Sequence, residues 1–222
     1  YILFLNSDGT VSDYQKISDT EGGFTATLND GDRFGISIAS IGDLNNDGIN
    51  DIAVCADLDD DGSTGDNNRG AVYILFLNSD GTVSNYQKIS DTAGGFTATL
   101  NDHDYFGVSI ASIGDLNNDG INDIAVGAHL DADGGTNRGA VYILFLNSDG
   151  TVSNYQKISG TEGNFTATLN DDEFGVSIAS IGDLNNDGIN DIAVGAHFDD
   201  DGSTNRGAVY ILFLNSDGTV SN

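Results

Sequence analysis

The sequence predicts an all-β protein made of repeated units of four antiparallel strands, and two observations carry this expectation. The phrase YILFLNSDGTVS begins at Tyr1, Tyr73, Tyr142 and Tyr210, so its four copies recur at nearly constant spacing. Short apolar runs also alternate with connections rich in Asp, Asn and Gly, which is typical of hairpins. Since no apolar run has a helical period of useful length, we expect about three repeats of about 68–72 residues built from strands alone.

The second copy of the repeat shows its four strands most clearly. We predict the first strand over residues 106–114 (FGVSIASIG) and the second over 123–128 (DIAVGA). The third covers residues 139–147 (GAVYILFLN) and the fourth 154–159 (NYQKIS). Because the third strand is apolar on both faces, its sheet must be covered on both sides. Sheets stacked in this way describe the blades of a β-propeller, and a stacked solenoid is the alternative.

Composition restricts the partners of the chain. The formal net charge is −28, with 35 acidic residues against 7 basic ones, and nearly all the acids are Asp. Such a surface repels nucleic acid and anionic membranes and attracts cations. The longest apolar run, AVYILFL, is far shorter than the ~20 residues that cross a bilayer, so we expect no membrane span. A solvated acidic surface is the other explanation of the charge, but it does not account for acids that recur in fixed register.

One phrase in each repeat, GDLNNDGINDIAV, has the spacing of a calcium-binding loop. Its three copies begin at Gly42, Gly114 and Gly182. In the first copy, oxygen-bearing side chains stand at Asp43, Asn45 and Asp47, and Asp51 follows after a glycine. Ca²⁺ takes six to eight oxygen ligands from a tightly curled loop. An EF-hand is excluded, because its twelfth position would be valine and its flanks are strands.

The repeat resembles the FG-GAP repeat, which is the blade unit of the integrin α-chain β-propeller. The FG pairs are Phe34-Gly35, Phe106-Gly107 and Phe174-Gly175. The GAP positions read Cys55-Ala56-Asp57, Gly127-Ala128-His129 and Gly195-Ala196-His197, without the proline. The resemblance covers essentially the whole chain and implies propeller blades within a larger ring or a tandem array.

The same resemblance divides the chain into blades. Residues 34–105 and 106–173 would each form a blade. Residues 1–33 would supply the third and fourth strands of a partial blade, and residues 174–222 the first three strands of another. We therefore expect about one Ca²⁺ per repeat.

In the blades of this family, Asp and Asn side chains and one backbone carbonyl supply the oxygens. The resemblance implies these ligands: Asp43, Asn45, Asp47, Ile49 and Asp51; Asp115, Asn117, Asp119, Ile121 and Asp123; Asp183, Asn185, Asp187, Ile189 and Asp191.

A second Asp-rich loop in each repeat is a weaker metal candidate. Its acidic residues are Asp57, Asp59, Asp61, Asp131, Asp133, Asp199 and Asp201. Two copies have His129 and His197 in place of the first carboxylate, and His is a poor Ca²⁺ ligand. An acidic surface turn without metal is the favoured alternative.

We expect no enzymatic activity, because a repeat that triplicates every polar group does not build one asymmetric active site. The near-identity of the repeats favours an extracellular structural array or filament stabilised by Ca²⁺. Cell-surface adhesion, with a protein or glycan ligand, is the alternative implied by the resemblance to integrins. Extracellular calcium modules bind with a Kd of about 10⁻⁴–10⁻³ M, so such sites fill outside cells. The partial blades at both ends predict self-association of neighbouring repeats or subunits, including strand exchange.

Overall fold

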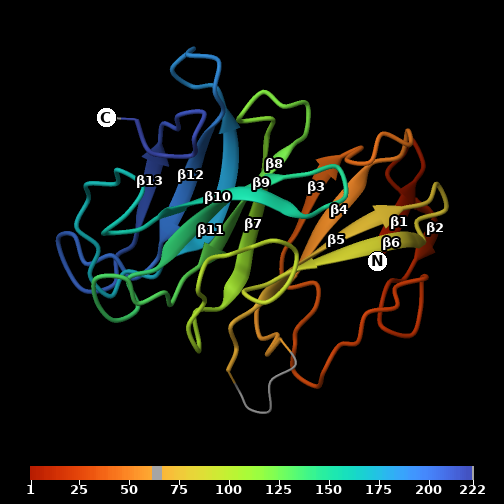
Figure 1. Cartoon of the computed structure of the whole chain (residues 1–222), viewed down its shortest axis with the longest axis horizontal. Helices are drawn as coiled ribbons and strands as arrows, with labels where there is room; N and C mark the ends of the chain where they lie inside the picture. Colours follow the sequence, from red (N-terminus) through yellow and green to blue (C-terminus); the bar gives the residue numbers. More distant parts are fainter. Residues whose placement is uncertain (62–66, 222) are drawn as a thin grey trace.

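The computed structural model describes residues 1–61 and 67–221, and within them the chain folds into thirteen strands in four antiparallel sheets (Figure 1). This confirms the all-β prediction of four-stranded blades. The described residues contain no helix, so none is long and apolar enough to cross a membrane. Residues 62–66, in the second Asp-rich loop of the first repeat, and residue 222 lie outside the described part.

The sheets follow one another along the chain, and in each the strands pair in sequence order. The N-terminal hairpin is β1 (Ile2–Leu5) with β2 (Val11–Gln15). The first complete sheet is β3 (Ile38–Gly42), β4 (Asp51–Ala56), β5 (Ala71–Leu77) and β6 (Val83–Ile89). The second is β7 (Phe106–Gly114), β8 (Asp123–Ala128), β9 (Ala140–Leu146) and β10 (Val152–Ile158). The last has three strands, β11 (Phe174–Gly182), β12 (Asp191–Ala196) and β13 (Ala208–Leu212).

The predicted strands of the middle repeat match the structure, except at the start of the fourth. Strand β10 begins at Val152, before the expected Asn154. Val152 pairs with Leu146 and Asn154 with Phe145, so an irregularity between them absorbs one extra residue. Because of this bulge, strand pairing extends back to Val152, which the neighbouring turn residues had predicted to lie in a loop.

The third strand of the middle repeat lies between two hydrophobic cores. All seven residues of β9 are buried. Tyr142 and Leu144 pack with Ile74 of the preceding sheet, while Val141 and Ile143 belong to a cluster with residues of the following sheet. The middle blade is therefore stabilised on both faces by its neighbours, at about 1.5–3 kcal/mol for each large apolar side chain buried.

Polar bonds between blades repeat with the same spacing as the cores. Asn122 donates its amide to the carbonyl of Ile41 at 2.8 Å, and Asn190 donates to that of Ile113 at 2.9 Å. The hydroxyl of Ser109 donates to the carbonyl of Gly175 at 2.7 Å, and Ser37 makes the equivalent bond one blade earlier. Each blade–blade contact thus carries the same two hydrogen bonds.

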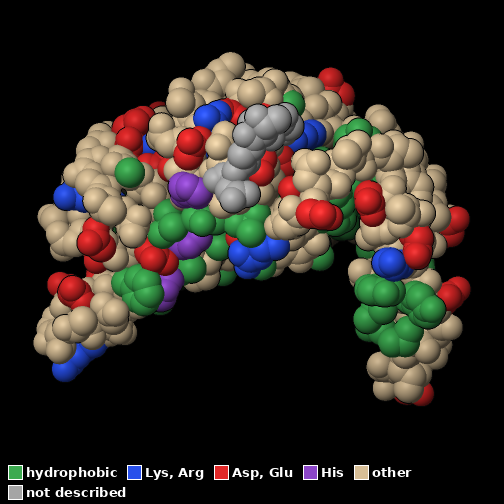
Figure 2. Space-filling view, turned by 90° about the horizontal axis from the view of Figure 1, so that it is seen from below, with side chains coloured by type: hydrophobic (Ala, Val, Ile, Leu, Met, Phe, Trp, Pro, Cys, Tyr) green, Lys and Arg blue, Asp and Glu red, His purple; other side chains and the backbone are tan. Residues whose placement is uncertain are grey.

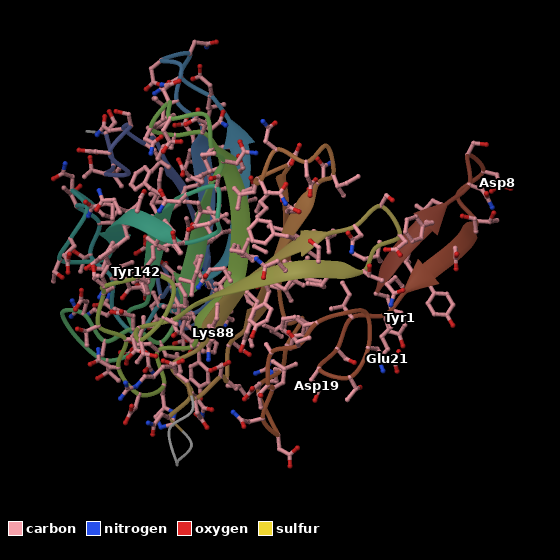
Figure 3. The ribbon with its side chains drawn as sticks, turned by 45° about the vertical axis from the view of Figure 1, so that its right-hand side comes forward. Tyr1, Asp8, Asp19, Glu21, Lys88 and Tyr142 are labelled. Carbon is pink, nitrogen blue, oxygen red and sulfur yellow. The ribbon has the colours of Figure 1, made fainter. Side chains whose placement is uncertain are left out.

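The stacked sheets form an open arch, with the N-terminal hairpin at one end and the last sheet at the other (Figure 2). Figure 3 shows the hairpin, with Tyr1 and Asp8, standing out from the rest of the molecule. Among the described residues, the exposed large hydrophobic side chains fall only within residues 1–38 and 181–211, which belong to the two ends. The arch therefore covers its apolar surface everywhere except at its ends.

Candidate metal centres and lysine sites

The three predicted calcium loops connect the first two strands of their blades: β3 to β4, β7 to β8 and β11 to β12. Each loop curls through two left-handed residues. In the first loop these are Asn46, with φ of 62°, and Gly48, with φ of 92°. Asn and Gly adopt such backbone with little strain, which explains why the phrase has these residues at these positions.

Hydrogen bonds inside the loop turn its oxygen side chains inward. In the middle repeat, the two oxygens of Asp115 accept the N–H groups of Asp119 (2.9 Å) and Gly120 (2.8 Å). The Asn117 side-chain oxygen also accepts the N–H of Asp119, and Asp119 accepts that of Ile121, both at 2.9 Å. The other two loops repeat these four bonds at nearly the same distances. The local sequence therefore fixes the loop in the same way in all three repeats.

The last acidic residue of each loop anchors it to the sheet. The carboxylate of Asp123 is fully buried and accepts the N–H groups of Leu116 at 2.9 Å and Leu146 at 3.1 Å. Burial raises the pKa of Asp123 to about 6, although these two bonds work against the rise. Burial likewise raises the pKa of Asp51, and Asp191 is held by the equivalent pair of bonds.

The donor set of each loop fits a hard divalent cation. It consists of three carboxylates, one amide oxygen and a backbone carbonyl, which are the ligands that Ca²⁺ prefers. A carboxylate offers about four lone-pair sites, so the bonds to backbone N–H groups leave acceptor capacity for an ion. Across residues 1–61 and 67–221, no three His, Cys, Asp or Glu side chains form a group that could hold a metal. Binding would therefore draw mutually repelling carboxylates together and would use the amide and carbonyl oxygens as well.

In the middle repeat, the second Asp-rich loop holds a lysine. The ammonium group of Lys157, from β10, lies 2.9 Å from Asp131 and 2.6 Å from Asp133. Asp131 also accepts the hydroxyl proton of Tyr142 at 3.1 Å. Burial alone would lower the pKa of Lys157, but the two carboxylates raise it overall, so the lysine is charged.

The first repeat has the same arrangement. Lys88 lies 2.8 Å from Asp59 and 2.9 Å from Asp61, and the hydroxyl of Tyr73 donates to Asp59 at 2.7 Å. In these two repeats a lysine therefore pairs with the carboxylates that the sequence offered as weaker metal ligands. Their metal binding stays a prediction.

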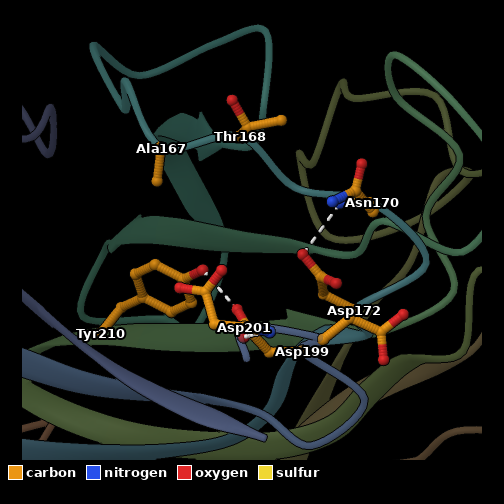
Figure 4. A pocket seen from close by; sticks show the side chains of 8 residues that line it. Ala167, Thr168, Asn170, Asp172, Asp199, Asp201 and Tyr210 are labelled. Carbon is orange, nitrogen blue, oxygen red and sulfur yellow. Dashed lines mark hydrogen bonds between the residues drawn. The ribbon is translucent and has the colours of Figure 1, made fainter. Parts of the chain in front are cut away.

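The third repeat has the same acids without a lysine. Asp199 accepts the hydroxyl of Tyr210 at 2.8 Å, and Asp201 lies beside it. Within the described residues no salt bridge to a lysine or arginine reaches either carboxylate. Instead, a cavity of about 400 Å³ opens between these residues, Asp172 and Thr168 (Figure 4).

The first residue of each second Asp-rich loop has a partner other than the lysine. Asp57 pairs with Arg33 at 3.3 Å. The imidazoles of His129 and His197 lie 3.8 Å and 3.5 Å from the carboxylate of Glu173. Burial, with His197 and Arg33 nearby, lowers the pKa of His129 to about 4, so this imidazole is neutral at neutral pH.

Sequence reasoning missed the role of the fourth-strand lysine. The signal was present, because Lys88 follows the Asp59–Asp61 pair and Lys157 follows the Asp131–Asp133 pair at the same place in the repeat. Their distance along the chain hid the pairing, which arises only when the fourth strand folds beside the second loop.

Stacked four-stranded blades with an Asp/Asn-rich hairpin loop in each define a repeat protein of the β-propeller type. The FG-GAP repeat model matches residues 34–75, 106–144 and 174–212, which is more than half of the chain. The chain therefore belongs to the FG-GAP repeat family, as its sequence predicted.

Curated relatives are integrin α chains. The chain is 37% identical to integrin alpha-3 of Cricetulus griseus over 151 residues, which is 68% of this chain and 13% of that protein. It is 42% identical to human integrin alpha-6 over 117 residues (51% and 9%). It is 34% identical to integrin alpha-PS5 of Drosophila melanogaster over 171 residues (75% and 15%). The chain thus spans less than a sixth of the length of these relatives.

Proposed function

We propose that this chain is a segment of an extracellular, cell-surface β-propeller whose blades are stabilised by Ca²⁺ and whose surface binds a protein or glycan ligand in adhesion. Its similarity to integrin α chains supports adhesion and argues against an enzyme. The division into blades at residues 34, 106 and 174 is part of the proposal.

The observation that carries the calcium proposal is the identical hydrogen bonding of the three loops. In each, the backbone holds two Asp and one Asn side chain over the loop, and a buried Asp fixes the loop to its sheet. In the middle repeat, Asp115, Asn117, Asp119, the carbonyl of Ile121 and Asp123 would hold the ion. A bound ion would offset the repulsion between these carboxylates and would add its binding free energy to folding.

Thermal unfolding in Ca²⁺ and in chelator tests the stabilising role. We expect the Tm to fall in chelator, and Asp119→Ala to reduce the Ca²⁺-dependent part of the Tm. Asp149→Ala is the matched control, because Asp149 is exposed and accepts the N–H of Thr151 in a turn outside the loops. A Tm that is the same in Ca²⁺ and in chelator would refute the calcium proposal.

The adhesion proposal needs a separate binding measurement. The immobilised chain, loaded with Ca²⁺, would be tested against a panel of purified extracellular-matrix glycoproteins and their isolated glycans. Saturable binding that a chelator abolishes is the expected result. An absence of saturable binding across the panel would leave the structural role as the better account of the chain.

A second candidate function is a Ca²⁺-stabilised structural array, and a specific observation favours it. Residues 106–154 and 174–222 differ at only three positions. Uniform units suit an assembly in which every contact is alike, whereas a ligand-binding propeller needs loops that differ. Electron microscopy distinguishes the two functions, because an array predicts extended particles and an adhesion propeller predicts discrete rings.

A further inference from the structure

We propose that Asn164 is the acceptor of an N-linked oligosaccharide, which the chain carries beside the fourth-strand edge of its blades. The proposal rests on the extracellular location given under the proposed function, because this modification belongs to exported proteins. It depends neither on calcium binding by the loops nor on the nature of the adhesion ligand.

A single departure from the repeat creates the acceptor sequence. Residues 163–169 read GNFTATL, whereas residues 22–28 and 94–100 both read GGFTATL. The replacement of one glycine by Asn164 gives the tripeptide Asn-Phe-Thr, which has the Asn-X-Ser/Thr pattern of an acceptor with a residue other than proline in the middle. No other asparagine among the 222 residues begins this pattern.

The backbone conformation at this position suits glycine. Asn164 has a φ of 59°, and the corresponding Gly23 and Gly95 have φ of 78° and 76°. Glycine adopts this left-handed conformation without strain, and asparagine is one of the few other residues that tolerate it. The asparagine therefore offers no better backbone than glycine, and what it adds to the turn is its side chain.

The side chains of the acceptor sequence are accessible and unengaged. Asn164 and Thr166 are exposed. In the part of the chain that the structure describes, neither the amide of Asn164 nor the hydroxyl of Thr166 makes a hydrogen bond. The turn at Asn147 is different, because that amide donates to the hydroxyl of Thr151 at 2.9 Å. Asn164 therefore has a free amide group that an enzyme can reach.

Phe165 orients the two side chains that flank it. Its ring packs against the rings of Phe174 and Tyr210, with centroid distances of 5.0 and 5.5 Å. Exposed and less exposed residues alternate from Asn164 onward, as in an extended segment, where residues two apart share a face. The anchored ring thus leaves Asn164 and Thr166 on the solvent side, where one enzyme can contact both.

The exposure of the acceptor is a property of the turn in every repeat. The corresponding turn of the middle repeat connects the two complete sheets. There, Gly95 and Thr97 are exposed, while Phe96 between them is only 3% exposed. The same pattern of exposure therefore occurs in the interior of the repeat array.

The turn lies beside the fourth-strand edge of the blades. In both complete sheets the fourth strand is at the edge opposite the first strand. The N–H of Val152, the first residue of β10, donates to the carbonyl of Gly94 at 2.8 Å, and that of Val220 donates to the carbonyl of Gly163 at 2.9 Å. A strand edge invites pairing with other chains, and a bulky, solubilising oligosaccharide on Asn164 would hinder such pairing.

The transfer step uses a lipid-diphosphate-linked oligosaccharide as the donor. The side-chain nitrogen of Asn164 forms a bond to the anomeric carbon of the first sugar. The bond from that carbon to the diphosphate oxygen breaks, and the lipid diphosphate leaves with the electron pair. The amide of Asn164 gives up one proton. The transferase supplies the catalytic groups, and Thr166 serves as a recognition residue.

Mass spectrometry of the secreted chain tests the proposal. The whole chain, behind an added leader, would be expressed in a eukaryotic cell that makes N-linked oligosaccharides and recovered from the medium in Ca²⁺. We expect a mass above the 23.1 kDa of the chain, with the addition confined to the peptide that contains Asn164. Peptide N-glycosidase should release the oligosaccharide from the folded chain without denaturant, because Asn164 is exposed.

Three variants separate the acceptor sequence from other causes of a mass increase. Asn164→Gly restores the residue of the other two repeats, so the chain should fold and stay unmodified. Thr166→Ala keeps the asparagine but should lose most of the modification. Thr166→Ser retains a hydroxyl and should restore it. Thermal melts check that each variant is folded.

Three outcomes would overturn the proposal. They are a folded, secreted chain with an unmodified Asn164, modification that persists in Thr166→Ala, and an oligosaccharide that is released only after unfolding. Only chain recovered from the medium enters this test, whereas the calcium and adhesion measurements can be made on unmodified chain. A failure of the acceptor site is therefore distinct from a failure of the proposed function.

Discussion

The middle and third repeats have nearly the same sequence but different environments. Between residues 106–154 and 174–222, only Leu130, Ala132 and Gly135 are replaced, by Phe, Asp and Ser. Nevertheless, Ile143 is fully buried, while the corresponding Ile211 is 43% exposed. The difference arises because the middle blade has a neighbour on each side and the third has a neighbour on one side only.

This comparison shows that the local fold and the stability of a blade have different origins. The predicted calcium loops have the same internal hydrogen bonds in both repeats, and these bonds join residues of the loop itself. Core burial and the lysine site depend on elements supplied from outside the local segment, as expected for a repeat protein stabilised by nearest-neighbour contacts.

The largest expected difference between repeats concerns the lysines. Lys157→Met should lower the free energy of unfolding by about 3–5 kcal/mol, because Asp131 and Asp133 would be left as uncompensated charges. Lys16→Met, on the exposed hairpin, should cost less than about 1 kcal/mol in the monomer. Urea unfolding at low chain concentration measures both values. Equal losses would show that burial does not distinguish the two lysines.

Truncation of the matched isoleucines gives the next largest effect. Ile143→Ala should cost about 2–4 kcal/mol, since it removes a fully buried side chain and leaves a cavity. Ile211→Ala should cost less than about 1 kcal/mol in the monomer, because that side chain is already half in water. Chemical denaturation of both variants checks the pair. The comparison fails if Ile211→Ala is as destabilising as Ile143→Ala.

A pH effect should follow from Asp104, which lies 1% exposed near the lysine site of the middle repeat. Burial raises the pKa of Asp104 to about 6, against the opposing bond from the N–H of Asn101. Because this folded pKa lies above the unfolded value, the contribution of Asp104 to stability is present below pH 4 and is lost as the pH rises through about 6.

Asp104→Asn should therefore stabilise the chain by about 2 kcal/mol at pH 7.5 and remove this part of the pH dependence. Thermal melts between pH 4 and pH 8 measure the difference from the unmodified chain. Asp102→Asn is the control, since the side chain of Asp102 is 54% exposed. A variant that is less stable than the parent at pH 7.5 would contradict the direction of the pKa shift.

The smallest effect concerns the hydrogen bonds between blades. Asn122→Ala should cost about 1 kcal/mol, because it removes the donor to the carbonyl of Ile41. Asn50 is the matched control, as it holds the same place in the first repeat and is exposed. Asn50→Ala should change the free energy of unfolding by less than about 0.5 kcal/mol. If both variants lower the free energy of unfolding by about 1 kcal/mol, the loss of the hydrogen bond between blades does not explain the destabilisation.

Much of the fold could be predicted because its signals are local. The apolar pattern of residues 139–147 predicted a strand buried on both faces, and all seven residues of the observed strand β9 are buried. The NSDGT turns were also predictable, since the side chain of Asp149 accepts the N–H of Thr151, two residues later in the chain. The start of β10 was missed because a bulge is set by the pairing of two strands and not by either strand alone.

The candidate sites were predicted less completely. The curled loops follow from Asn, Asp and Gly at fixed spacing, and the structure shows them with a consistent set of bonds. The partner of Asp131 and Asp133 could not be read from their own loop, because Lys157 comes from the fourth strand of the blade, with the whole of β9 in between.

Isothermal titration calorimetry with Ca²⁺ tests the central claim most directly, namely that the three loops are equivalent metal sites in spite of their different surroundings. Three sites per chain, with a Kd of about 10⁻⁴–10⁻³ M, are the predicted result. The Asp119→Ala variant should then bind two ions. The absence of any saturable Ca²⁺ binding by the folded chain would contradict the account.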